Sequence, residues 1–232
     1  MKNLLPVLEV LEAEIVACRR CPRLVEYRER IGQEKRRAYR DCEYWARPVP
    51  GFGDPAARVL AFGLAPGAHG SNRTGRPFTG DASGNFMYPI LHRLGFASQA
   101  EATTREDGMK LRDLWITAAV RCAPPDNKPL PSELAACAEF TRREIAALPC
   151  LRVMVALGRI AFDALLADEG RRAGAVLRRA EYVFGHGAEY RLPSGLTLLA
   201  SYHPSNQNTA TGKLTDTMFE AVFARAQQLA RY

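Results

Sequence analysis

The sequence predicts an α/β protein in which a parallel β-sheet is covered by helices on both faces. Four short runs of apolar, β-favouring residues predict strands, and helical patterns separate them. The four runs are residues 59–62, 114–120, 151–157 and 196–200. The chain has 232 residues, of which 47% are hydrophobic, so it can bury a full core. We therefore expect one domain over residues 1–232.

The helices are predicted from apolar residues at helical spacing and from flanking caps. They are residues 4–17 behind Asn3, a helix from Asn85 that stops at Gly95, a helix capped by Ser132, residues 160–166 and residues 215–229. Residues 98–110 are predicted to form a loop, and residues 169–195 a basic turn region with a short hairpin. Residues 19–53 are basic and aromatic without clean periodicity. Such a mixture can follow a phosphate backbone or form a solvated charged face.

The charge balance favours an anionic partner such as nucleic acid. Lys+Arg 32 against Asp+Glu 25 gives a formal net charge of +7, although an inert basic surface would give the same count. No apolar run approaches the ~20 residues that span a bilayer. The N-terminal region, with Pro6 and four acidic residues by Glu26, is not typical of a secretory signal peptide. We expect a cytoplasmic protein that uses no membrane.

Four of the six cysteines have a spacing that is typical of metal ligands. Cys18 and Cys21 form a Cys-x2-Cys pair, and Cys122 and Cys137 are possible partners far along the chain. In a reducing compartment such a pair is more often a metal or redox device than a disulfide. Four thiolates can hold zinc or an iron–sulfur cluster, and spacing does not choose between them. The other two cysteines, Cys42 and Cys150, are assigned no function.

Residues 58–86 predict a ligand site. The first strand ends at Gly63, and a stretch rich in Gly, Pro, Ser and Thr follows before the helical pattern resumes. Glycines let the backbone approach a ligand closely, while Pro66 and Pro77 stiffen the path. In open α/β sheets ligands bind at the carboxyl ends of strands. A plain surface loop is the alternative, but long loops in compact domains are usually functional.

Three features together resemble the uracil-DNA glycosylase superfamily. They are Gly63-Leu64-Ala65-Pro66-Gly67 after the first strand, His203-Pro204-Ser205 after the last strand, and the four spaced cysteines. The resemblance runs from Cys18 to the final helix and is strongest to the iron–sulfur branch, family 5 (the type B enzymes). It implies a three-layer α/β/α sandwich with a four-stranded parallel sheet. It also implies a [4Fe-4S] cluster on Cys18, Cys21, Cys122 and Cys137, and hydrolysis of the glycosidic bond of damaged bases in DNA.

Three side chains are assigned chemical roles on this basis. An enzyme that acts on a base inside a duplex must flip the base out and hold it in a pocket. We expect Phe78 to stack on the flipped base and His203 to donate a hydrogen bond to the leaving uracil, where negative charge develops. Asp81 would lie near the sugar cation and orient or activate water. The alternative is an aspartate that only caps a helix or forms an Asx turn.

Two departures from family 4 relatives concern the catalytic water and the base specificity. Leu64 stands where those relatives carry a glutamate, and a leucine cannot handle a water, so Asp81 is the nearest replacement. Ala118 stands where they carry a uracil-reading asparagine, and the missing amide predicts relaxed base specificity. Rejection of a wrong base depends on polar groups that the wrong base leaves unpaired. We therefore expect excision of uracil and also of hypoxanthine and xanthine.

Other residues are predicted to contact the base or the DNA. The backbone of Gly63, Leu64, Ala65 and Gly67 would line the base site. His69 and Asn127 would contact the base, although a loop histidine or a turn asparagine needs no such role. The predicted DNA contacts are Arg73, Ser201, Ser205, Asn206, Gln207 and Asn208, with loop solvation as the alternative.

The leading hypothesis is a monofunctional glycosylase that acts on DNA as a monomer and leaves an abasic site. We expect the cluster to have a structural role and to position DNA. A non-catalytic DNA-binding module with iron–sulfur or zinc is the main alternative. A phosphate-ester hydrolase also fits the glycine-rich loop, but the sequence lacks a phosphate-loop lysine and a carboxylate cluster for magnesium.

Overall fold

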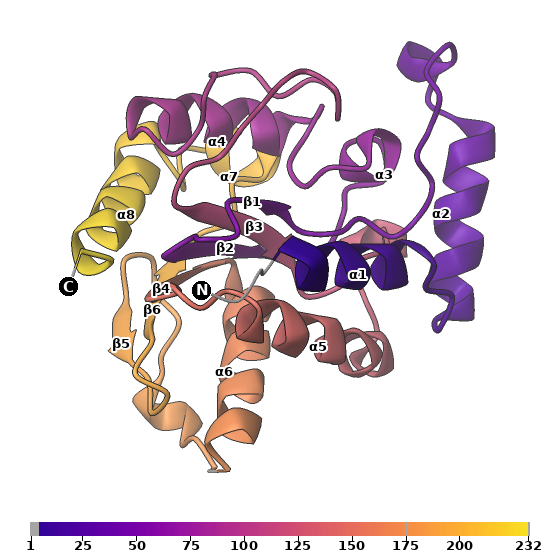
Figure 1. Cartoon of the computed structure of the whole chain (residues 1–232). Helices are drawn as coiled ribbons and strands as arrows, with labels where there is room; N and C mark the ends of the chain where they lie inside the picture. Colours follow the sequence, from indigo (N-terminus) through magenta and orange to yellow (C-terminus); the bar gives the residue numbers. More distant parts are fainter. Residues whose placement is uncertain (1–4, 175, 232) are drawn as a thin grey trace.

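The computed structural model describes residues 5–174 and 176–231. Within these residues a single six-stranded sheet runs through the molecule in the order β1-β3-β2-β4-β6-β5 (Figure 1). Its strands are β1 (Phe52–Gly53), β2 (Val59–Gly63), β3 (Leu114–Ala118), β4 (Val153–Leu157), β5 (Glu189–Arg191) and β6 (Thr197–Ser201). The central strands β3, β2, β4 and β6 are parallel, which confirms the predicted four-stranded parallel sheet. Two short antiparallel strands, β1 and β5, extend it at the edges.

Helices cover both faces of the sheet, which confirms the α/β sandwich. The helices are α1 (Leu5–Val16), α2 (Pro22–Glu34), α3 (Ser71–Thr74), α4 (Ala82–Arg93), α5 (Pro131–Ala146), α6 (Arg159–Ala173), α7 (Asn206–Ala210) and α8 (Asp216–Leu229). Three short 3₁₀ turns are η1 (Arg37–Tyr39), η2 (Pro125–Asn127) and η3 (Arg179–Glu181). Figure 1 shows α4 and α8 on one face of the sheet and α5 and α6 on the other.

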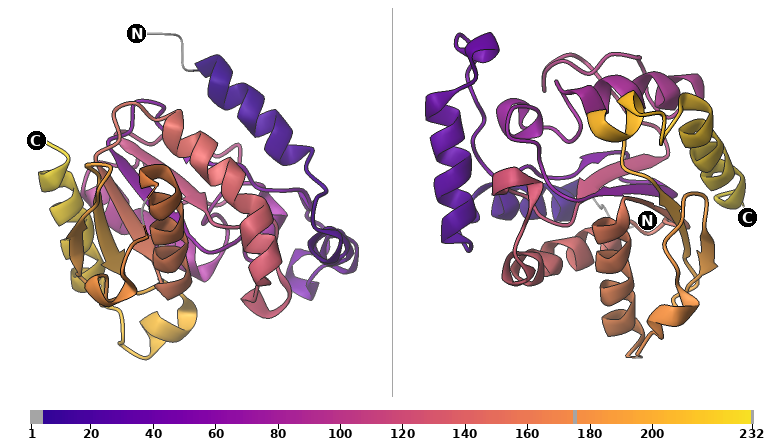
Figure 2. Two further views of the ribbon diagram at one scale, coloured as in Figure 1. Left: turned by 90° about the horizontal axis from the view of Figure 1, so that it is seen from below. Right: turned by 180° about the vertical axis from the view of Figure 1, so that it is seen from behind.

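The side chains of β2 alternate between the two faces of the sheet and so contribute to the two hydrophobic cores, one on each face. Val59 and Ala61 pack with the apolar faces of α4 and α8, whereas Leu60 and Phe62 pack with α5 and α6. Side chains of a strand point alternately to opposite faces, so one buried strand supplies both layers. Helix α1 lies outside the sandwich against α5 (Figure 2), and an Arg143–Glu14 ion pair links the two helices.

The prediction of residues 19–53 as aperiodic was wrong for residues 22–34, which form helix α2. Leu24, Val25 and Arg28 are its buried residues. An arginine therefore occupies a core-facing position where the hydrophobic pattern requires an apolar residue, and this hides the helical period.

Three helix boundaries also differ from prediction, and the first is that of α4, which begins at Ala82 rather than Asn85. Helix α5 begins at Pro131 rather than after a Ser132 cap, because the Glu133 carboxylate accepts a hydrogen bond from the Leu130 N–H at 2.7 Å. Helix α6 continues past the predicted residue 166 to Ala173. Its last turns bury Asp168 and Glu169 beside Arg172, and these charged residues conceal a buried helix face. No helix in the described ranges is long and apolar enough to cross a membrane.

Candidate active site

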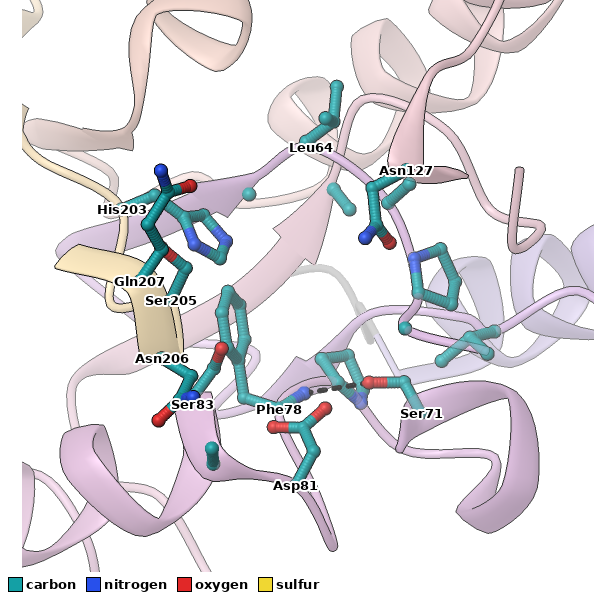
Figure 3. A pocket seen from close by; sticks show the side chains of 18 of the residues that line it. Leu64, Ser71, Phe78, Asp81, Ser83, Asn127, His203, Ser205, Asn206 and Gln207 are labelled. Carbon is teal, nitrogen blue, oxygen red and sulfur yellow. Dashed lines mark hydrogen bonds between the residues drawn. The ribbon is translucent and has the colours of Figure 1, made fainter. Parts of the chain in front are cut away.

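A cavity of about 630 Å³ opens where the carboxyl ends of β2, β3 and β6 meet (Figure 3). It brings together most of the predicted site residues, which come from distant parts of the chain. Those that line it are Gly63, Leu64, Ala65, Gly67, Phe78, Asp81, Asn127, His203, Ser205, Asn206 and Gln207. We call this cavity the base pocket. Its size suits one nucleobase with room for solvent, since small-molecule sites occupy about 300–1,000 Å³.

Phe78 and His203 form an aromatic pair inside the base pocket. Their ring centroids are 6.0 Å apart with an angle of 34° between the planes, and Figure 3 shows the rings pointing toward one another. Phe78 has a left-handed backbone with φ 50°, and its N–H donates to the Ser71 hydroxyl at 3.0 Å. A non-glycine residue rarely adopts this conformation, so the loop holds the ring in place at some conformational cost.

The absence of a side chain at Gly63 leaves room for the Phe78 ring. A Cβ atom at Gly63 would lie 3.0 Å from Cζ of Phe78 and 3.3 Å from Cε2. The strand therefore ends in glycine because the aromatic ring packs directly on its backbone.

The His203 imidazole has no hydrogen-bond partner on its ring among the described residues. Its backbone carbonyl accepts a hydrogen bond from the Asn208 side-chain amide at 2.8 Å, which fixes the segment but leaves the ring available. Burial lowers the pKa of His203 to about 4. The ring is therefore neutral near neutral pH, and a neutral imidazole donates through one nitrogen and accepts through the other.

Asp81 both caps a helix and lines the base pocket. Its Oδ1 accepts a hydrogen bond from the Gly84 N–H at 3.0 Å, which makes Asp81 the N-cap of α4. Burial raises the pKa of Asp81, while hydrogen bonds from the backbone of Gly84 and Ser83 act in the opposite direction. A Cβ atom at Gly70 would lie 1.9 Å from Oδ2, so the glycine makes room for the carboxylate. The capping role that was the alternative for Asp81 is therefore present, and the carboxylate still lines the cavity.

One wall of the base pocket is apolar, because Leu64 and Ala118 both line the cavity. Asn127 lines it too, from an exposed position in η2 with φ 55°. This wall thus has the side-chain amide of Asn127 from the η2 turn and no side-chain amide from strand β3, where Ala118 stands.

Four predicted residues lie elsewhere. Ser201 is fully buried and donates to the Tyr202 carbonyl at 2.9 Å, so its hydroxyl does not face a phosphate. The Arg73 guanidinium donates to the carbonyls of His69 and Gly80 at 2.9 and 2.8 Å, so it braces the loop from within the protein. His69 lines a second cavity beside the base pocket. Asn208, as described above, holds the His203 backbone.

Sequence reasoning missed three residues that shape the site. Ser71 fixes the Phe78 backbone, Ser83 lines the rim, and Arg36 reaches the cavity from the segment after α2. Serines in a polar loop carry no distinguishing signal. Arg36 stands in a run of basic residues, so only the tertiary structure sets it apart.

The four predicted metal ligands pack around one apolar cluster. This cluster contains Leu11, Ile15, Leu24, Val120 and Phe140 together with Cys122 and Cys137, and Cys18 and Cys21 pack against it. Burial raises the pKa of Cys122 to about 12 and also raises the pKa of Cys137. The buried Arg28 guanidinium donates to the Cys122 sulfur at 2.8 Å. We call this part of the molecule the cysteine region.

No three His, Cys, Asp or Glu side chains of the described ranges converge as closely as a single metal ion requires. The four thiols nevertheless pack with one apolar cluster.

Residues 50–227 match the family model of the uracil DNA glycosylase superfamily. The chain is 58% identical to the Type-5 uracil-DNA glycosylase of Thermus thermophilus over 222 residues, which cover 96% of this chain and 98% of that protein. It is 45% identical to the Type-5 uracil-DNA glycosylase of Mycobacterium tuberculosis, with 95% and 81% covered. A Type-4 uracil-DNA glycosylase of Pyrobaculum aerophilum is 36% identical over 56% of this chain and 59% of its own length.

Proposed function

Because the chain belongs to the uracil-DNA glycosylase superfamily, we propose that it flips uracil out of DNA and hydrolyses the N-glycosidic bond, leaving an abasic site. One observation carries this proposal. The Phe78 ring lies beside the His203 imidazole in a cavity large enough for a base. The imidazole nitrogens have no hydrogen-bond partner among the described residues. The names of the relatives, Type-5 uracil-DNA glycosylases, support the same activity.

His203 stabilises the leaving base. As the glycosidic bond breaks, negative charge develops on the uracil ring oxygens, and a neutral N–H donor that is already in place lowers the energy of that state. Because the pKa of His203 is about 4, the ring donates a hydrogen bond but holds no extra proton to transfer at neutral pH. Phe78 supplies the stacking face that positions the flipped base against this donor.

Asp81 acts on the sugar side of the reaction. Its carboxylate accepts backbone hydrogen bonds and lines the same cavity, so it can hold a water molecule and stabilise the positive charge on the sugar. Burial raises the pKa of Asp81 and makes the carboxylate a stronger base than an exposed aspartate.

The apolar wall predicts a broad substrate range. Leu64 and Ala118 carry no group that would be left unpaired by a base other than uracil. We therefore include hypoxanthine and xanthine among the substrates.

A [4Fe-4S] cluster would be held by Cys18, Cys21, Cys122 and Cys137. The shared apolar cluster around these thiols supports this ligand set. The cluster would supply a cross-link between the segment joining α1 to α2 and the segments after β3, with 100 residues between Cys21 and Cys122. No step of the reaction is assigned to it.

The test uses duplex oligonucleotides that carry one uracil, hypoxanthine or xanthine, incubated with the purified protein without magnesium. Alkaline cleavage then reveals abasic sites. We expect cleavage at all three bases and its loss in His203→Ala, with His92→Ala, a substitution of an exposed histidine on α4, as the matched control. Tight DNA binding without any cleavage would instead support the non-catalytic DNA-binding module.

A further inference from the structure

A second cavity of about 490 Å³ adjoins the base pocket, and we call it the side cavity. The two cavities share Arg36, Gly67, Asp81, Ala82 and Asn127 in their walls. The side cavity extends from this junction toward α2 and η1. A strand of DNA whose base occupies the base pocket therefore passes next to it.

Arg36 is an available cation at the junction of the two cavities. Its side chain is exposed, and no carboxylate of the described residues lies within 4.0 Å of it. The arginines of the preceding segment differ, because Arg19 pairs with Glu29 and Arg23 pairs with Glu133. These two arginines thus have carboxylate partners within the protein, whereas Arg36 has none among the described residues and is available to an anionic ligand.

Two tyrosines supply flat surface in the side cavity. Tyr27 and Tyr39 both line it and are half-buried. The Arg73 guanidinium packs over the Tyr39 ring at 4.2 Å from its centroid and is itself held by two backbone carbonyls. Tyr39 is therefore braced before any ligand arrives. Aromatic side chains beside a cation are the usual means of binding unpaired bases.

His69 adds a neutral hydrogen-bonding group to the same cavity. Its Nδ1 lies 2.9 Å from the Tyr44 hydroxyl, which also accepts a hydrogen bond from the Arg36 backbone N–H at 3.5 Å. Nδ1 is therefore occupied by the contact with Tyr44, and the other ring nitrogen is Nε2. That nitrogen has no partner among the described residues.

We propose that the side cavity binds the nucleotide next to the flipped base on the same strand, with its base against Tyr27 and Tyr39 and its phosphate at Arg36. This inference rests on the proposed glycosylase function. The carboxylates of Asp81 and Asp126 also line the cavity and repel a phosphate, which leaves the Arg36 position for the anion. The protein thus holds the flipped nucleotide and one neighbouring nucleotide. Excision therefore depends on the neighbour on one side of the flipped base and not on the neighbour on the other side.

The first experiment varies the neighbouring base. Single-stranded oligonucleotides carry uracil with an abasic spacer on its 5′ side, on its 3′ side or on neither. The wild-type protein should lose about tenfold in kcat/KM for one of the two spacers only. In Tyr39→Ala the same spacer should cause no further loss, and Tyr27→Ala provides a second variant should the first fold poorly. Equal effects of both spacers, or full sensitivity in both tyrosine variants, would overturn the inference.

The second experiment tests the phosphate. A neutral methylphosphonate replaces the linkage on either side of the uracil, and Arg36→Ala is compared with Arg37→Ala. Arg37 is the adjacent exposed arginine and lines neither cavity. Arg36→Ala should lower the slope of log Kd against log salt by about one and abolish sensitivity to one methylphosphonate. Equal losses in the two variants would show a general basic surface and contradict the proposal. A wild-type protein that excises no uracil from any oligonucleotide would refute the proposed function itself, which separates the two failures.

Discussion

The base pocket and the cysteine region differ in the hydrogen-bond and ion-pair partners of their polar side chains. In the cysteine region, arginines meet partners within the protein: Arg23 pairs with Glu133, and the Arg28 guanidinium donates to the Cys122 sulfur, although its Nε has no partner among the described residues. In the base pocket, the His203 ring finds no partner within the described chain, and a left-handed Phe78 packs beside it. A neutral imidazole that lines a cavity has a donor and an acceptor nitrogen to offer to a ligand. The difference indicates that one region stabilises the fold and the other is kept for a ligand.

The largest effect should come from removing a cysteine of the buried set. Cys122→Ser removes one ligand of the proposed [4Fe-4S] cluster, so iron binding and its visible absorbance should be lost. The α1, α2 and α5 side of the domain should also unfold, because such a site and the fold form together. The loss should be comparable with the whole stability of a domain, about 5–15 kcal/mol. Cys150→Ser is the matched control, since Cys150 is exposed and outside the cluster. Iron content, visible absorbance and urea unfolding measure the outcome. A Cys122→Ser protein that stays fully folded but loses excision would give the cysteine region a chemical role.

Asp81→Ser separates the two roles of Asp81 in the base pocket. Serine is a good N-cap, so α4 should keep its start, whereas Asp81→Ala should lose about 0.5–2 kcal/mol of stability. Both variants lack the carboxylate and should lose about 10²–10⁴-fold in excision rate. Single-turnover excision and urea unfolding, measured on the same preparations, give both quantities. Full activity in Asp81→Ser would reduce Asp81 to a capping residue.

The pH dependence of stability should differ between the two pocket groups. The folded pKa of His203, about 4, lies below the ordinary 6.5, so between these values the unfolded chain binds a proton that the folded chain does not. His203 therefore makes the protein less stable as the pH falls from about 6.5 to about 4. Asp81 has a folded pKa raised above the ordinary 3.8. Its contribution to stability therefore increases as the pH falls through the folded pKa toward 3.8.

His203→Ala should remove the destabilisation by acid between pH 6.5 and 4 and should lower the excision rate about 10²–10³-fold at neutral pH. Urea unfolding at a series of pH values checks the first effect, and single-turnover excision checks the second. His92→Ala should change neither. An unchanged acid slope in His203→Ala would mean that another group carries it.

The stretch that forms the centre of the base pocket could be predicted from the sequence, and the reason is physical. Gly63, Phe78 and Asp81 lie within one stretch after a strand, and glycines and prolines mark such a loop directly. The parallel order of strands then brings His203 to the same edge of the sheet. Local signals were therefore sufficient for the centre of the site.

Features that depend on partners far away in sequence were harder to predict. Helix α2 was missed because Arg28 faces the core to reach Cys122, a residue 94 positions away. The predicted DNA contacts of Arg73 and Ser201 stay predictions, although both side chains donate to backbone carbonyls close by in the chain, those of His69 and Gly80 for Arg73 and that of Tyr202 for Ser201. Arg36 could not be told from its basic neighbours by sequence, because it is set apart only by lining both cavities.

The smallest expected effect concerns the apolar wall of the base pocket. Ala118→Asn places an amide where the wall has only a methyl group. A base whose carbonyl and ring N–H cannot reach this amide leaves it unsatisfied, so excision of the larger purines hypoxanthine and xanthine should fall about tenfold relative to uracil. Ala118→Leu, which adds similar volume without polar atoms, is the control and should slow the larger purines by crowding alone. Competition assays with all three bases give the ratios. If leucine and asparagine narrow the substrate range equally, then space and not hydrogen bonding sets the specificity of this pocket.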